Sequence, residues 1–177
     1  MVPDETLAPG IDVSNYQGSV DWPTVASSGI TFAYAKATEG TGFVDQTFAA
    51  NWDGMKAAGI ARGAYHFFRP REDPQAQAAL FAQTVGAIEP GDMPPAVDIE
   101  ATDGITGAAL ADRILSMLEA VEAQLKTRPI IYTSPGFWNS YVRDASGSWP
   151  AWTPSYYLWV ANYTSAPLPY IPNGWSL

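Results

Sequence analysis

The chain has 177 residues, of which 47% are hydrophobic, so it can form one domain with a substantial core. Its formal net charge of -9 at pH 7 repels phosphate backbones and anionic lipid surfaces, so we expect no nucleic-acid or membrane partner. Cysteine is absent, which excludes disulfides and thiolate metal sites.

The first half of the chain alternates short apolar runs with helical segments. In order, its predicted elements are a strand over residues 10–14, a short helix from Trp22, a strand over 30–40, a helix over 46–58 and a strand over 61–68. Asp21 precedes the first helix as an N-cap, and Pro23 suits its first turn. Gly59 follows the second helix and can end it.

The second half continues this alternation, with shorter helices and more prolines toward its end. Its predicted elements are a helix over residues 73–85, a strand over 94–100, a helix over 110–125, a strand over 128–133, a short helix over 135–141 and a strand over 156–163. Asp73 followed by Pro74 is a typical helix start. The helix over 110–125 is the clearest, because its apolar residues fall on one face.

This alternation predicts an α/β fold with parallel strands and helical crossovers, either an open doubly wound sheet or a barrel. The first strand is not followed by a glycine-rich phosphate loop, which an open nucleotide-binding sheet would carry. We therefore predict a TIM-like β/α barrel. The part beyond Ser134 is expected to be irregular, since its helices are short.

Two carboxylates end the apolar run "PPAVDIE" at residues 94–100. On a strand, Asp98 and Glu100 point to the same side, roughly 6.6 Å apart along the chain, whereas Val97 and Ile99 point to the other. If helices cover Val97 and Ile99, both acids face the barrel interior near the carboxyl end of the strand, where such barrels place their chemistry. The same reasoning turns Asp12 inward on the first strand.

Three carboxylates at one mouth favour protonation of the most enclosed member. We expect burial beside Asp98 to raise the pKa of Glu100, so that Glu100 is the un-ionised acid and turnover falls as the pH rises through neutral. A neutral carboxyl beside ionised ones suits glycoside cleavage, in which one acid protonates the leaving oxygen and others stabilise positive charge on the sugar. The alternative is structural: these acids cap loops or pair with Lys36 and Arg69.

Aromatic rings gather near the same predicted mouth. Tyr65 and Phe67 share one face of the third strand, Tyr132 ends the fifth, and Trp159 and Tyr163 share one face of the sixth. Ring faces can stack on the apolar faces of sugars, although each ring taken singly could also pack in the core. We interpret these rings as substrate-binding residues.

Other catalytic chemistries have less support. His66 is the only histidine, and we expect it to be a buried, hydrogen-bonded core residue. A hard-cation site at Asp12, Asp98 and Glu100 is an alternative by ligand type, but no further acid pattern supports it, so we expect no metal or other cofactor. No serine lies in a G-x-S-x-G elbow.

Several segments resemble, in order, those of family 25 glycoside hydrolases, the N-acetylmuramidase lysozymes of phage endolysins and bacterial autolysins. They read "GIDVSNYQG", "AYAKATEGTGFVD", "GAYHFFRP", "PPAVDIE", "RPIIYTSPGFW" and "YYLWVANY". The resemblance implies a modified β/α barrel that hydrolyses the β-1,4 bond from N-acetylmuramic acid to N-acetylglucosamine in peptidoglycan.

The resemblance also implies roles for the acids. Glu100 matches the general acid/base, and Asp12 matches the N-terminal active-site aspartate. Asp98 matches an aspartate that acts either as nucleophile or by positioning the substrate's 2-acetamido group for attack. The sequence does not separate these routes, and we favour the assisted one, with retention of configuration.

The family pattern continues after "PNGWSL" with a further strand and another aspartate, so the resemblance implies a barrel without its final strand or strands here. We expect residues 1–9 to be an N-terminal arm and residues 10–177 a C-terminally incomplete catalytic domain. An open barrel edge favours self-association. The alternative function is a non-catalytic glycan-binding fragment that keeps the aromatic groove.

The expected place of action is the bacterial cell wall. The segment "MVPDETLAPG" has neither the basic start nor the apolar core of a signal peptide. We therefore expect either a secreted protein whose export signal has been removed or a phage lysin released without its own signal.

Overall fold

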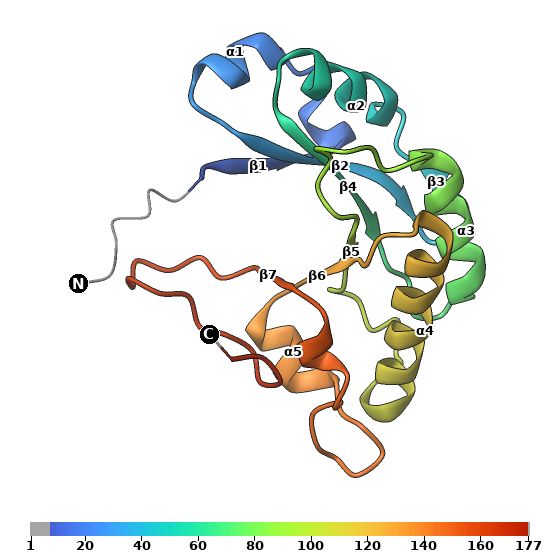
Figure 1. Cartoon of the computed structure of the whole chain (residues 1–177). Helices are drawn as coiled ribbons and strands as arrows, with labels where there is room; N and C mark the ends of the chain where they lie inside the picture. Colours follow the sequence, from blue (N-terminus) through green and yellow to red (C-terminus); the bar gives the residue numbers. More distant parts are fainter. Residues whose placement is uncertain (1–7, 177) are drawn as a thin grey trace.

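The computed structural model describes residues 8–176, which form one seven-stranded sheet with helices on its outside (Figure 1). The strands are β1 (Gly10–Val13), β2 (Phe32–Glu39), β3 (Phe43–Val44), β4 (Ala61–Phe67), β5 (Ala96–Asp98), β6 (Ile130–Thr133) and β7 (Leu158–Val160). The helices are α1 (Trp22–Ser27), α2 (Phe48–Ala57), α3 (Pro74–Val85), α4 (Gly107–Leu125) and α5 (Pro135–Tyr141), with short 3-10 helices η1 (Asn15–Gln17) and η2 (Thr153–Ser155). Most of the expected N-terminal arm, residues 1–7, lies outside the described residues.

The sheet is parallel along its main path, in the order β1-β2-β4-β5-β6-β7, so the carboxyl ends of these strands meet at one edge. Figure 1 shows the sheet curling, with α2, α3 and α4 outside it and with β1 and β7 at its two ends. The predicted TIM-like barrel is confirmed in this incomplete form. No pairing between β1 and β7 closes it within residues 8–176.

Several local features differ from the predicted elements. The strand predicted over residues 156–163 is shorter, because β7 covers only Leu158–Val160 and Tyr163 lies beyond its end. β3 was not predicted: it pairs antiparallel with β2 after a turn at Gly40, whose φ is +55°, and two residues are too few to show a period. β5 ends at Asp98 and not at Glu100, although the Ile99 amide still donates to Tyr132 O at 2.9 Å. Glu100 therefore lies on a segment that is leaving the sheet.

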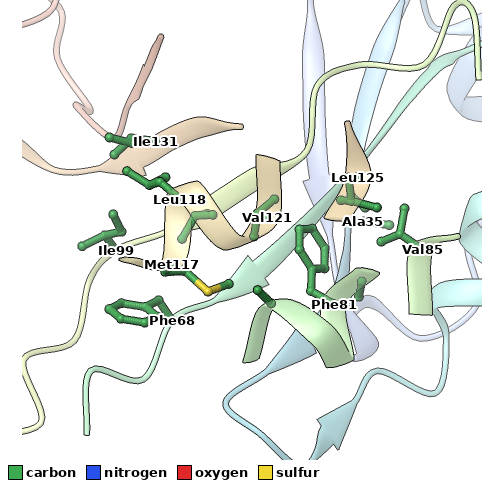
Figure 2. Close-up of a cluster of buried hydrophobic side chains, with 14 of the residues drawn as sticks. Ala35, Phe68, Phe81, Val85, Ile99, Met117, Leu118, Val121, Leu125 and Ile131 are labelled. Carbon is green, nitrogen blue, oxygen red and sulfur yellow. The ribbon is translucent and has the colours of Figure 1, made fainter. Parts of the chain in front are cut away.

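The core lies between the outer face of the sheet and the apolar face of α4 (Figure 2). Met117, Leu118 and Val121 of α4 are fully buried. Val97 and Ile99 are fully buried as well, which confirms the prediction that they point toward the helices. Each such side chain contributes about 1.5–3 kcal/mol on burial, so this packing fixes which way β5 faces. Asp98 is consequently held on the opposite, inner side.

The predicted helix boundaries are supported by local hydrogen bonds. The Asp21 carboxylate accepts from Thr24 N at 3.4 Å, and the Asp73 carboxylate accepts from Gln75 N at 3.0 Å. Gly59 has a φ of +75° after α2, which is a left-handed conformation that glycine adopts at low cost. None of the helices within residues 8–176 combines the length and apolar character needed to cross a bilayer.

His66 is a fully buried core residue, as expected. Its Nε2 lies 3.0 Å from Gln77 Oε1, and its Nδ1 lies 2.7 Å from Thr38 Oγ1. Because a side-chain amide oxygen only accepts, Nε2 carries the proton and Nδ1 accepts from the threonine hydroxyl. Burial lowers the pKa of His66 to about 4, so the ring is neutral at neutral pH.

Candidate active site

Three carboxylates meet at the carboxyl ends of the parallel strands. Asp12 lies on β1, Asp98 ends β5, and Glu100 follows two residues later. They line a cleft of about 130 Å³ together with Tyr65, Tyr132 and Trp159. All three predicted catalytic residues are therefore brought to one cavity.

A second hollow of about 230 Å³ continues this cleft toward the two ends of the sheet. The two cavities share Asp12, Tyr132 and Trp159, and the second also touches Tyr163. Asp12 is exposed, because β1 is an end strand with no neighbour on its outer side within the described residues. The cleft is thus walled by β4, β5 and β6 but open between β1 and β7.

Asp98 is the most enclosed of the three acids, with 7% of the residue exposed. Its Oδ1 is buried and has no hydrogen-bond partner within residues 8–176. Burial raises the pKa of Asp98 to about 8, and the charge of Glu100 adds to this rise. Asp98 is therefore neutral at neutral pH and holds a proton beside the cleft.

Glu100 is exposed at the mouth of the cleft. Partial burial and the charge of Asp12 raise the pKa of Glu100 above its ordinary value. The direction predicted for the pKa of Glu100 is therefore confirmed, but the prediction that Glu100 is the un-ionised acid is wrong: the most enclosed acid is Asp98, because β5 ends there. Glu100 is left free to approach a bound molecule.

Two tyrosines supply neutral donors to the same cleft. Burial and the charges of Asp12 and Asp98 raise the pKa of Tyr65. Burial and the charges of Glu100 and Asp98 raise the pKa of Tyr132. Both phenols therefore remain protonated at neutral pH and can donate hydrogen bonds to a ligand.

Trp159 forms an aromatic wall of the cleft. Its ring centroid lies 4.8 Å from that of Tyr132 and 4.7 Å from that of Tyr34. The Tyr34 hydroxyl donates to Pro94 O at 2.9 Å, which anchors the ring below the cleft. Such a wall offers an apolar face next to the carboxylates, as stacking on a sugar ring requires.

The other two predicted binding residues lie further out. Tyr163 is 98% exposed and lines only the outer hollow. Phe67 is not part of the lining of the acid cleft. Its ring instead contacts two cations, with Lys36 Nζ at 5.2 Å and Arg69 Cζ at 4.9 Å from the ring centroid. The substrate contacts of all five rings stay predictions.

A cluster of ion pairs beside Phe67 was not predicted. Glu39 binds Lys36 at 2.5 Å and Arg69 at 2.6 Å, and Arg69 also binds Asp103 at 3.3 Å. The structural alternative assigned these two cations to the cleft acids. Both cations form their ion pairs with carboxylates outside the acid cleft, namely those of Glu39 and Asp103.

The described side chains that could bind a metal ion would have to lie grouped in the fold to do so. Within residues 8–176, no three or more His, Asp or Glu side chains are grouped so that they could hold a metal ion.

Carboxylates and aromatic rings at the carboxyl ends of parallel barrel strands are typical of barrel glycoside hydrolases. The sequence profile described as Glycosyl hydrolases family 25 matches residues 11–177. The chain belongs to this family.

Individual relatives agree with this assignment. Lysozyme M1 of Streptomyces globisporus is 37% identical over 97% of this chain and 63% of its own length. The uncharacterised protein YegX of Escherichia coli (strain K12) is 37% identical over 88% of this chain and 59% of its own length. The structure of a muramidase from Acremonium alcalophilum has a TM-score of 0.87 at 30% identity, covering 97% of this chain and 84% of that one. The chain thus spans about three fifths of the length of the first two relatives.

Proposed function

We propose that this chain is a peptidoglycan hydrolase that cleaves the β-1,4 bond between N-acetylmuramic acid and N-acetylglucosamine. The observation that carries this proposal is the pairing of a buried, unpartnered Asp98 with an exposed Glu100 in one cleft walled by aromatic rings. Membership of family 25 and the similarity to a named lysozyme support it.

In this proposal Glu100 is the general acid/base and Asp98 assists it. The free protein keeps a proton on Asp98. A bound 2-acetamido group that donates its N–H to Asp98 favours the ionised form of Asp98, so the proton moves to Glu100. Glu100 then protonates the leaving glycosidic oxygen, while the acetamido oxygen attacks the anomeric carbon.

The second half of the reaction returns Glu100 to its acid form. Glu100 removes a proton from the water that attacks the anomeric carbon, so the product keeps the original configuration. Asp12 stabilises the positive charge that builds on the sugar. Tyr65 and Tyr132 donate hydrogen bonds to the substrate, and Trp159 stacks on it.

Release of reducing ends from purified cell wall tests the proposal. We expect the unsubstituted protein to release reducing ends and Glu100→Gln to release almost none, since Gln cannot transfer the proton. Turnover that survives Glu100→Gln would remove Glu100 from the mechanism.

A non-catalytic glycan-binding fragment is the second candidate, and one observation favours it. The cleft is open between β1 and β7, so Asp12 is more exposed than an enclosed active-site acid would be. Binding to purified cell wall without any release of reducing ends would support this candidate over the first.

The same open edges support self-association. β1 and β7 each have one side without a partner strand within residues 8–176, and unpaired strand edges template pairing with another chain. We propose that copies of this chain associate there. Sedimentation at several protein concentrations tests this, and a constant monomer mass at all of them would oppose it.

We further propose that residues 10–177 act as the catalytic domain on the bacterial cell wall. The protein would reach the wall either by secretion or as a phage lysin. Locating the protein in fractionated producing cells, with and without phage induction, separates the two routes.

A further inference from the structure

Arg69 joins the loop after β4 to the ends of the strands on either side of it. Its Nε and Nη2 donate to Glu39 Oε1 at 2.9 and 2.6 Å, and Glu39 ends β2. Its Nη1 donates to Asp103 Oδ1 at 3.3 Å, and Asp103 lies in the turn after β5. Since β4 lies between β2 and β5, one guanidinium connects three neighbouring strand ends.

The backbone of Arg69 is itself held on both sides. Arg69 N donates to Gln77 Oε1 at 2.9 Å, and Gln77 Nε2 donates to Arg69 O at 2.8 Å. Gln77 is fully buried and is fixed in turn by His66 at 3.0 Å. The Phe67 ring lies 4.9 Å from the Arg69 Cζ and supports the guanidinium from one side. The cation is thus placed before any ligand binds.

The segment that Arg69 reaches is the one that carries Glu100. At its start, Ile99 is tied to β6, because Ile99 N donates to Tyr132 O at 2.9 Å and Ile99 O accepts from Thr133 Oγ1 at 2.8 Å. At its other end, Asp103 has a φ of +46°, an uncommon backbone conformation for a residue with a side chain. The side chain of Asp103 contacts the Arg69 guanidinium there.

Glu100 has no side-chain hydrogen bond of its own to any residue in the range 8–176. Its carboxyl position therefore depends on the backbone between Ile99 and Asp103. At Ile99 this backbone is bonded to β6 of the sheet. At Asp103 its side-chain contact is with Arg69.

We propose that Arg69 is a positioning residue, which holds the turn at Asp103 against β2 and so keeps the Glu100 carboxyl at the cleft. This inference rests on the proposed function only in giving Glu100 the proton transfer. Arg69 does not line the acid cleft. Its loss should therefore impair the chemical step more than substrate binding.

Steady-state kinetics on solubilised peptidoglycan test the proposal with Arg69→Gln, Asp103→Asn and the double variant. A displacement of about 1 Å at a catalytic group can cost up to about 100-fold, so we expect kcat to fall roughly 10- to 100-fold with KM within about twofold. The double variant should lose no more than Arg69→Gln, because that variant has already lost the contact with Asp103 that Asp103→Asn weakens. If the kcat losses of the two single variants multiplied in the double variant, the proposal would be overturned. A rise in KM with kcat unchanged would also overturn it.

Arg128→Gln is the matched control. Arg128 also pairs with a carboxylate at 3.3 Å, that of Glu122, but on the outside of the molecule with 54% of its side chain exposed. The control should keep kcat within about twofold, as expected for an exposed ion pair. An equal loss of kcat in Arg128→Gln would mean that any lost ion pair has this effect, and the proposal would fail.

Amide hydrogen exchange gives a readout that does not need turnover. The Gly104 and Ile105 amides donate to Thr102 Oγ1 at 3.2 Å and Thr102 O at 2.8 Å, so they report on the turn. They should exchange at least about tenfold faster in Arg69→Gln and in Asp103→Asn, and at the original rate in Arg128→Gln. Unchanged exchange in both variants overturns the proposal. If the unsubstituted protein has no turnover, the proposed function fails, and the exchange rates alone decide whether Arg69 holds the turn.

Discussion

Replacing Asp98 with Asn should stabilise the protein at neutral pH while it removes activity. Burial and the charge of Glu100 raise the pKa of Asp98 to about 8 in the folded protein, from an ordinary value of 3.8. Below pH 3.8 the carboxyl is protonated in both the folded and the unfolded chain, so it does not change stability. As the pH rises from 3.8 to about 8, only the unfolded chain loses this proton, and the folded state becomes progressively less favoured.

The size of the effect follows from these two pKa values. Each pH unit in this range is worth about 1.4 kcal/mol, so the destabilisation at pH 7.5 is at most about 5 kcal/mol. Water that enters the cleft lowers this figure, and we expect Asp98→Asn to gain about 2–5 kcal/mol at pH 7.5 and less than about 0.5 kcal/mol at pH 4. For a chain of this size the gain at pH 7.5 raises Tm by roughly 4–20 °C.

Thermal unfolding followed by circular dichroism at pH 4 and pH 7.5 measures both values. Asp112→Asn is the control, because Asp112 is an exposed aspartate on α4. It should change Tm equally at the two pH values. A gain for Asp98→Asn that is the same at both pH values, or absent at pH 7.5, would refute the reasoning.

Three further predictions concern pH and packing. Turnover should fall as the pH rises through about 8, because the Asp98–Glu100 pair then loses its proton, and a flat rate from acid to alkaline conditions would contradict this. Burial lowers the pKa of His66 to about 4, so its contribution to stability is full above pH 6.5 and is lost as the pH falls toward 4. The stability difference between the unsubstituted protein and His66→Gln, measured by urea unfolding, should therefore shrink by about 3 kcal/mol from pH 7 to pH 4, and a constant difference would oppose it. Met117→Ala should cost about 2–5 kcal/mol in urea unfolding and leave KM unchanged, since Met117 is buried in the core away from the cleft, and a loss below about 1 kcal/mol would contradict the packing.

The orientation of β5 could be predicted because its sequence alternates between apolar residues and acids, which places the two kinds of side chain on opposite faces. Val97 and Ile99 had to meet the helices, so Asp98 was required to face inward, and the structure confirms the burial of both apolar residues. The apolar face of α4 was equally readable from its helical period. The period of apolar residues in the sequence was therefore enough to predict the orientation of an element that has one buried face.

The ion pairs around Glu39 could not be predicted in this way. On a regular strand, Lys36 and Glu39 would point to opposite faces, because they are three residues apart. The pairing of β2 with β4 shifts register between Lys36 and Thr38, and this irregularity brings Lys36 and Glu39 within 2.5 Å of one another. Such a bulge depends on the neighbouring strand and leaves no period in the sequence.

The order of protonation was also beyond the sequence. It depends on where β5 ends, because Asp98 lies inside the sheet and Glu100 lies just past it. Asp98 and Glu100 have the same kind of side chain, and strand ends are set by tertiary contacts such as the bond from Thr133 Oγ1 to Ile99 O. The sequence placed a carboxyl pair at the cleft but assigned the proton to Glu100, whereas the more enclosed Asp98 holds it in the free protein.

In the proposed function, the Asp98–Glu100 pair cuts peptidoglycan on the reducing side of N-acetylmuramic acid. Borohydride reduction of the fragments released from purified peptidoglycan, followed by mass spectrometry, identifies the sugar at each new reducing end. We expect reduced N-acetylmuramic acid to form with the unsubstituted protein and not with Glu100→Gln. New ends of reduced N-acetylglucosamine, or equal release by Glu100→Gln, would contradict it.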